Sequence, residues 1–170
     1  MLDKLQTLLS ALSRIMAWLA GLALVAMVAL VVVDVVGRQI FPTLSVHGAV
    51  ELVVILLVMV GFFGLPQAFD RNGHLNVEVA TAAAPERLRR GLDLLWSLVG
   101  AATAGFLCWM ALDTGLYLQA TGQVSEILRI KPLVPYGLAA TGLALAVLAA
   151  ANAALRLARG QHLDRTDTDL

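Results

Sequence analysis

The chain has 170 residues and no net formal charge, and its composition is 59% hydrophobic and only 14% charged. Soluble domains carry about 25% charged residues, so this composition excludes an ordinary soluble domain and indicates an integral membrane protein. The balanced charge gives no sign of a nucleic-acid partner, and the single cysteine excludes an internal disulfide.

Residues 1–14 predict an amphipathic helix, because the leucines at positions 2, 5, 9 and 12 fall on one helical face. Such a helix either lies in the membrane interface or continues into the first span. The apolar run that follows, 15–33, is longer than the hydrophobic region of a secretory signal peptide. We therefore expect an uncleaved first span over residues 15–36.

The first two spans are expected to form an antiparallel hairpin. Phe41-Pro42 ends the first span, since the residue before a proline is disfavoured in a helix, and the connection to Gly48 is short. The second span, 49–69, is long enough to cross a bilayer core of roughly 30 Å at about 1.5 Å per residue. Pro66, near its end, predicts either a kink or a frayed last turn.

Charged side chains near this hairpin predict a polar clamp between spans one and two. Asp34 and Arg38 are four residues apart, so they share a helix face and can pair. Glu51 opens the second span and is the third member of the predicted clamp. Contact with another protein, or a site for a coupling ion, is the alternative role for these side chains.

A second polar turn follows span two. Arg71 and His74 are expected to bond the free carbonyls at the end of that span, with Gly73 supplying a positive φ angle. The alternative for His74 is a ligand or partner role.

Two further spans are predicted at 92–118 and 133–155. In the polar segment between them, Ser125 is expected to cap a short helical turn that starts at Glu126. Pro132 opens the fourth span, where the N–H that proline lacks costs little.

Small residues recur at helical spacing on the last two spans. They are Gly100, Ala101, Ala104 and Gly105, and then Gly137, Thr141, Ala146, Ala150 and Ala154. Such faces let helices approach closely, which predicts either packing within the chain or a seam with another protein.

The predicted fold is thus an all-α membrane domain of four transmembrane helices over 15–160, followed by a polar tail, 161–170. With an even number of spans, both termini lie on one side, which also carries nine of the twelve Lys and Arg residues. The other three are Arg38, Arg129 and Lys131. By the positive-inside rule, both termini are cytoplasmic and the 119–131 segment is on the outer side.

The sequence holds no pattern that predicts catalysis. It contains no dinucleotide-binding, nucleotide-phosphate or serine-hydrolase motif and no Cys/His cluster suited to zinc. The histidines, His47, His74 and His162, all fall outside the predicted spans, which argues against a haem held between spans. We therefore expect neither an enzyme nor a bound cofactor or metal.

Taken together, the pattern resembles the small membrane subunit of tripartite ATP-independent periplasmic (TRAP) transporters, the DctQ type. The residues that carry the resemblance are Asp34-x-x-x-Arg38, Gly48-x-x-Glu51-Leu52, Arg71-x-Gly73-His74-Leu75-x-Val77-Glu78, and Gly122-x-x-Ser125-x-x-Leu128-x-Ile130-x-Pro132 with Pro135. The resemblance extends from about Leu12 to Arg159. The chain departs from the family at Leu75 and Glu78, where Ile or Val and then Asp are more usual, at Pro66, and in lacking a tryptophan in span two.

The resemblance implies a subunit of a sodium-coupled importer of organic acids in the bacterial inner membrane. A large membrane subunit would carry the substrate and sodium sites, and a periplasmic substrate-binding protein would deliver the acid. This chain would brace the large subunit within membrane lipid and help to dock the binding protein. The outer loop Gln123–Lys131, including Ser125 and Arg129, is the expected contact for that protein, with Pro132 following it.

Two other functions stay open on the sequence. A small dimeric transporter that works alone would want an acid deep within a span, whereas Glu51 lies near the start of its span. A membrane anchor of a redox complex would hold a haem.

Overall fold

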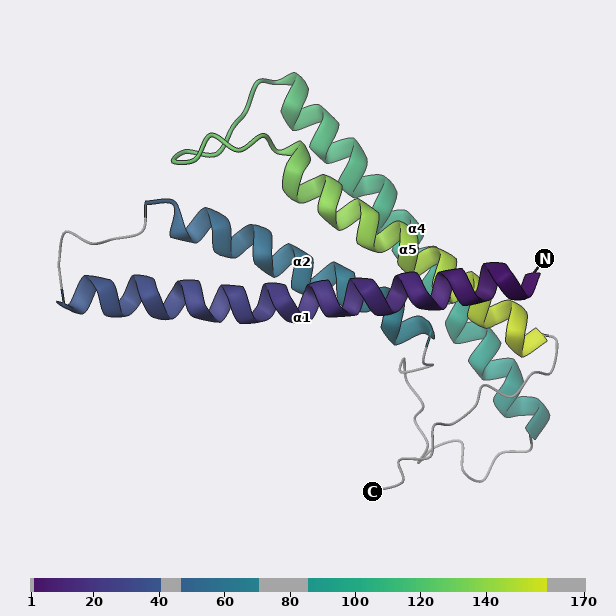
Figure 1. The fold of residues 1–170 in the computed structure, drawn as a ribbon. Helices are drawn as coiled ribbons and strands as arrows, with labels where there is room; N and C mark the ends of the chain where they lie inside the picture. Colours follow the sequence, from purple (N-terminus) through teal and green to yellow (C-terminus); the bar gives the residue numbers. More distant parts are fainter. Residues whose placement is uncertain (1, 41–46, 71–85, 159–170) are drawn as a thin grey trace.

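The computed structural model describes residues 2–40, 47–70 and 86–158, and these residues form four α-helices (Figure 1). The helices are α1 (Leu2–Ile40), α2 (Ala49–Asp70), α4 (Glu86–Ala120) and α5 (Leu133–Ala158). Each contains a stretch that is long and apolar enough to cross a membrane: Gln6–Ile40, Ala49–Phe69, Leu94–Ala120 and Leu133–Leu155. The predicted all-α membrane fold with four spans is therefore confirmed.

The amphipathic N-terminal segment and the first span belong to one continuous helix. α1 has 39 residues, so at about 1.5 Å per residue it is roughly 58 Å long, almost twice a bilayer core of about 30 Å. The hydroxyls of Ser10 and Ser13 donate to the carbonyls of Thr7 and Leu9 at 3.1 and 2.7 Å. These polar groups are thus satisfied inside the helix, and α1 must tilt or extend beyond the bilayer.

The helices are arranged as two pairs. α1 packs beside α2, α4 packs beside α5, and α2 also packs on α5. Figure 1 shows the pairs crossing toward the end that carries the N-terminus and diverging toward the opposite end. We call that opposite end, which carries His47, Gly48 and the 121–132 loop between α4 and α5, the loop end.

α5 is the central helix of the bundle. In an apolar 18-residue stretch of α5, 56% of the residues are buried, against 11%, 17% and 6% in the equivalent stretches of α1, α2 and α4. Ala146 and Ala150 have no exposed surface, and Leu143 and Ala146 pack with Ala104 of α4. The alanine face of α5 therefore packs inside the chain, and its alternative interpretation as a seam with another protein is wrong.

α2 and α5 approach to backbone contact at Gly142. A Cβ atom added to Gly142 would lie 2.6 Å from the carbonyl oxygen of Phe62, so glycine alone fits this contact. That carbonyl is four residues before Pro66, which has no N–H to bond it. A glycine Cα–H pointing at such an oxygen is a recurring weak contact between membrane helices.

Pro66 itself does not end the helix. It is fully buried, and α2 continues through it to Asp70. Membrane helices tolerate an internal proline where a neighbouring helix covers the freed backbone group, and here α5 does so at Gly142.

The contact at Gly142 predicts a large effect from one methyl group. Gly142→Ala should destabilise the folded chain by about 1–3 kcal/mol, because the new atom overlaps a backbone carbonyl that cannot move cheaply. Gly137→Ala is the matched control on the same helix, since nothing lies within 4 Å of its Cβ position. The control should be neutral or slightly stabilising, as alanine favours helix. Unfolding in detergent micelles measures both, and equal losses would contradict the assigned contact.

Candidate functional site

The structure contains the predicted ion pair at the loop end of α1. The guanidinium of Arg38 bonds the carboxylate of Asp34 through two of its three nitrogens, Nη2 to Oδ2 at 2.7 Å and Nε to Oδ1 at 3.2 Å. The pair lies within a single helix, and its arginine is 55% exposed. A pair of this kind holds one side chain in place on α1 and contributes little to stability.

Glu51 does not join this pair. Its carboxylate accepts hydrogen bonds from the hydroxyl of Ser125 and from the backbone N–H groups of Ile127 and Leu128, each at 2.8 Å. All three donors belong to the 121–132 loop, so Glu51 connects α2 to the link between α4 and α5. We call this set of bonds the Glu51–loop contact.

The predicted clamp of Asp34, Arg38 and Glu51 is therefore wrong. Asp34 and Arg38 pair as expected, but Glu51 binds the loop instead of joining them. Arg38 already bonds Asp34 on its own helix through two guanidinium nitrogens. The first turn of α2 instead faces the loop, where the carboxylate of Glu51 accepts charge-assisted bonds from the N–H groups of Ile127 and Leu128.

The loop begins with a regular helix ending. At the end of α4, the N–H of Gly122 bonds the carbonyl of Gln119 at 3.1 Å, and the N–H of Gln123 bonds that of Leu118 at 3.2 Å. With Gly122 at φ 70°, these bonds form a Schellman motif. The end of α4 thereby sets the direction in which the loop leaves the helix.

Ser125 closes the turn that follows. Its N–H bonds the carbonyl of Ile130 at 3.1 Å, and its hydroxyl accepts from the N–H of Ile130 at 3.0 Å. A turn is present at 126–128, as expected, but the predicted cap is wrong, because the acceptor for its N–H groups is the carboxylate of Glu51. Ser125 instead joins that carboxylate to the far side of the turn.

Gly48 gives the loop a second contact with the start of α2. It is buried, has φ 82°, and a Cβ there would lie 2.6 Å from Cγ of Leu128. Gly48 and Glu51 thus meet Leu128 and Ser125, so that two segments with the same three-residue spacing face each other. The sequence analysis missed the contact, and this equal spacing is a signal that could have indicated it.

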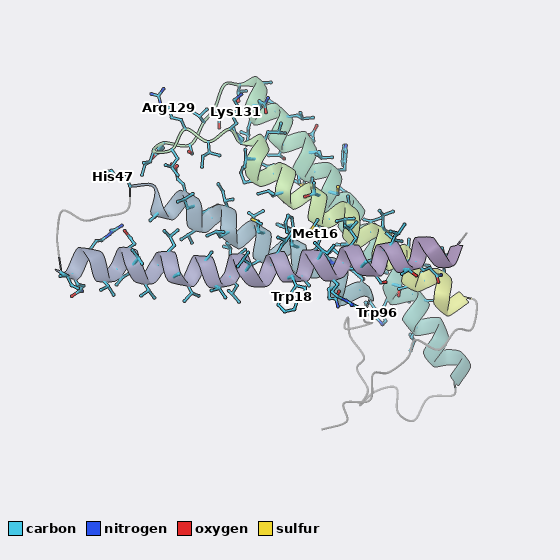
Figure 2. All side chains as sticks on the ribbon, in the orientation of Figure 1. Met16, Trp18, His47, Trp96, Arg129 and Lys131 are labelled. Carbon is cyan, nitrogen blue, oxygen red and sulfur yellow. The ribbon has the colours of Figure 1, made fainter. Side chains whose placement is uncertain are left out.

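Two further predicted site residues, Arg129 and Pro132, lie in or next to the loop. Arg129 is exposed and has φ 53°, an unusual angle for a residue other than glycine. Figure 2 shows Arg129 and Lys131 at the loop end together with His47. The carbonyl of Pro132 accepts from the N–H of Tyr136 at 3.3 Å in the first turn of α5.

Arg71, Gly73 and His74, predicted to form the turn after span two, lie outside the described residues, as does the tail 161–170. Within residues 2–40, 47–70 and 86–158, no group of three His, Cys, Asp or Glu side chains is placed to hold a metal ion.

One comparison with known proteins gives a match. The model of a family described as "Tripartite ATP-independent periplasmic transporters, DctQ component" matches residues 27–160. The match includes both segments that meet in the Glu51–loop contact. No curated protein and no solved structure matches the chain.

Two glycines separate the cost of backbone angle from the cost of packing. Gly48→Ala and Gly122→Ala should each cost about 1–2 kcal/mol, since both residues have positive φ. Gly48→Ala should cost more than Gly122→Ala, because its Cβ meets Leu128 whereas nothing lies within 4 Å of the other. Unfolding in detergent gives the comparison, and equal costs would mean that Leu128 moves aside freely.

Because Arg38 bonds Asp34 and Glu51 bonds the loop, we expect energetic coupling within the first pair but not between Arg38 and Glu51. In double-mutant cycles, Asp34→Ala and Arg38→Ala should show a coupling of about 0.5 kcal/mol or less. Arg38→Ala and Glu51→Ala should simply add, because the two side chains bind different partners. A clear coupling between Arg38 and Glu51 in detergent unfolding would restore the clamp and count against the assigned contact.

Proposed function

The chain belongs to the DctQ component family of tripartite ATP-independent periplasmic transporters, and on that premise we propose that it braces the large membrane subunit of a sodium-coupled importer of organic acids. In this proposal the large subunit carries the substrate and the sodium ions. A periplasmic binding protein delivers the acid, and this chain helps to dock it. The observation that carries the proposal is the family match over residues 27–160.

The distribution of buried surface supports a bracing role. α5 holds most of the buried residues, whereas only 11% and 6% of the residues are buried in the apolar 18-residue stretches of α1 and α4. Their exposed side chains are large and apolar, as at Val25 and Val28 of α1 and Phe106 and Trp109 of α4. Long apolar faces of this kind suit contact with lipid and with the helices of a larger membrane protein.

The use of charge in the described spans supports the same role. Asp34 and Arg38 pair on α1, and Glu51 binds the loop. All three lie toward the loop end. These three side chains thus bind within the chain itself, which suits a subunit that holds a neighbour while the neighbour moves the cargo.

The proposed orientation places the loop end on the periplasmic side of the bacterial inner membrane and both termini in the cytoplasm. The count of nine against three basic residues favours it. The loop end then presents the exposed side chains of His47, Arg129 and Lys131 to the binding protein. Basic groups on a rim steer and orient a partner with an acidic surface.

Reconstitution into liposomes tests the proposal. The chain should be purified alone, and then combined with the proposed large subunit and binding protein. Labelled carboxylic acids should enter only vesicles that hold both membrane subunits, with the binding protein outside and an inward sodium gradient. Vesicles with the large subunit alone are the control. Removing the sodium gradient should abolish uptake.

Three results of that experiment would overturn the proposal. Uptake by this chain alone would indicate a self-sufficient transporter. A visible haem absorption band in the purified chain would indicate a redox anchor. Full uptake by the large subunit without this chain would show that no brace is needed.

A further inference from the structure

We propose that Glu51 is a positioning residue, whose carboxylate fills an anion-binding nest in the 121–132 loop and so holds that loop in one preformed shape for a partner protein. The partner is the periplasmic binding protein, and this part rests on the proposed function. The proposal that the loop forms a nest depends only on the hydrogen bonds within this chain, and not on the proposed function.

The donors around the carboxylate form a compact nest. The N–H of Ile127 bonds Oε1 of Glu51, and the N–H of Leu128 bonds Oε2, both at 2.8 Å. The hydroxyl of Ser125 donates to Oε2 at the same distance. Successive backbone N–H groups that converge in this way bind anions, so the loop carries a site whose occupant is supplied by α2.

Only an anion satisfies this arrangement. Both oxygens of Glu51 receive N–H bonds. A glutamine at this position would turn its NH₂ group toward at least one of these donors, whichever way the amide is rotated. The isosteric Glu51→Gln change therefore removes the negative charge and at least one of the two N–H bonds without changing the volume of the side chain.

The loop has a shape that needs such support. Arg129 has φ 53°, and left-handed backbone is unfavourable for a residue with a Cβ. A conformation of this kind persists when the contacts around it are all satisfied. Here Ser125 joins the carboxylate to Ile130, one residue beyond Arg129, so the carboxylate of Glu51 fixes the backbone from which that side chain projects.

Amide hydrogen exchange tests the nest in the purified chain. In Glu51→Gln, the amides of Ile127 and Leu128 should exchange on the order of tenfold faster than in the unchanged chain, since a bond to a charged group is lost. Glu126→Gln is the matched control, because it removes the same charge from an exposed neighbour in the same turn. Equal exchange in the two variants would overturn the nest.

Chemical rescue tests whether the nest recognises an anion. Glu51→Ala leaves room for a small carboxylate, so added acetate should slow the exchange of these two amides again. Neutral acetamide should not slow it, and neither molecule should affect Glu51→Gln, whose side chain fills the space. Failure of acetate to slow the exchange would overturn the anion preference.

A milder variant covers the case in which the Glu51 changes prevent folding. Ser125→Ala removes one of the three donors and the acceptor for the N–H of Ile130. Exchange at Ile130 should then become faster, with a smaller rise at Leu128. Unchanged exchange at both positions would overturn the proposed arrangement.

The assembled transporter tests the positioning role. In Glu51→Gln, the concentration of binding protein that gives half-maximal uptake should rise several-fold, while uptake at saturating binding protein stays unchanged. A faster-exchanging loop with an unchanged half-maximal concentration would overturn the role toward the partner. If the unchanged assembly showed no uptake, the proposed function would fail, and the exchange results would still decide the nest.

Discussion

The loop end of this molecule depends on one carboxylate that three donors share. Glu51 receives bonds from Ser125, Ile127 and Leu128 at 2.8 Å, and through them α2 is joined to the connection between α4 and α5. The same helix meets α5 again at Phe62, eleven positions along the chain from Glu51, which is roughly 16 Å along the axis. The Glu51–loop contact and the contact of Phe62 with Gly142 therefore hold α2 at two points along its axis. Two separate points constrain the angle between α2 and α5 more than one contact would.

This construction suits a family whose members work within a larger membrane assembly. α5 packs closely against α2 and α4 through its alanines and glycine, while many large apolar side chains of α1 and α4 stay exposed. The described helices therefore expose much apolar surface. Asp34 and Arg38 pair with each other and Glu51 holds the 121–132 loop, which suits the proposed role of bracing a neighbouring subunit.

Sequence reasoning predicted the helices and the contacts within a single helix, and it missed the contacts between segments far apart in the chain. Apolar length and prolines indicated four helices, and the spacing of Asp34 and Arg38 indicated their ion pair, because both patterns lie within one element. The partners of Glu51 are 74 to 77 residues away, and two of them are backbone N–H groups, which every residue but proline has. The alanines of α5 were ambiguous for a related reason, since a small face looks the same whether a helix of this chain or of another covers it. The turn with Arg71, Gly73 and His74 lies outside the described residues and stays a prediction.

The separation between Glu51 and its donors has a consequence for how the chain is made. Ribosomes release α2 well before the 121–132 loop exists, so during synthesis this carboxylate sits at the head of its helix with none of its final partners. The bonds form only after α4 has been inserted and the chain has turned back toward α2. Closure of the loop end is therefore a late event in biogenesis, and a chain truncated before Ser125 would leave the carboxylate of Glu51 without these three donors.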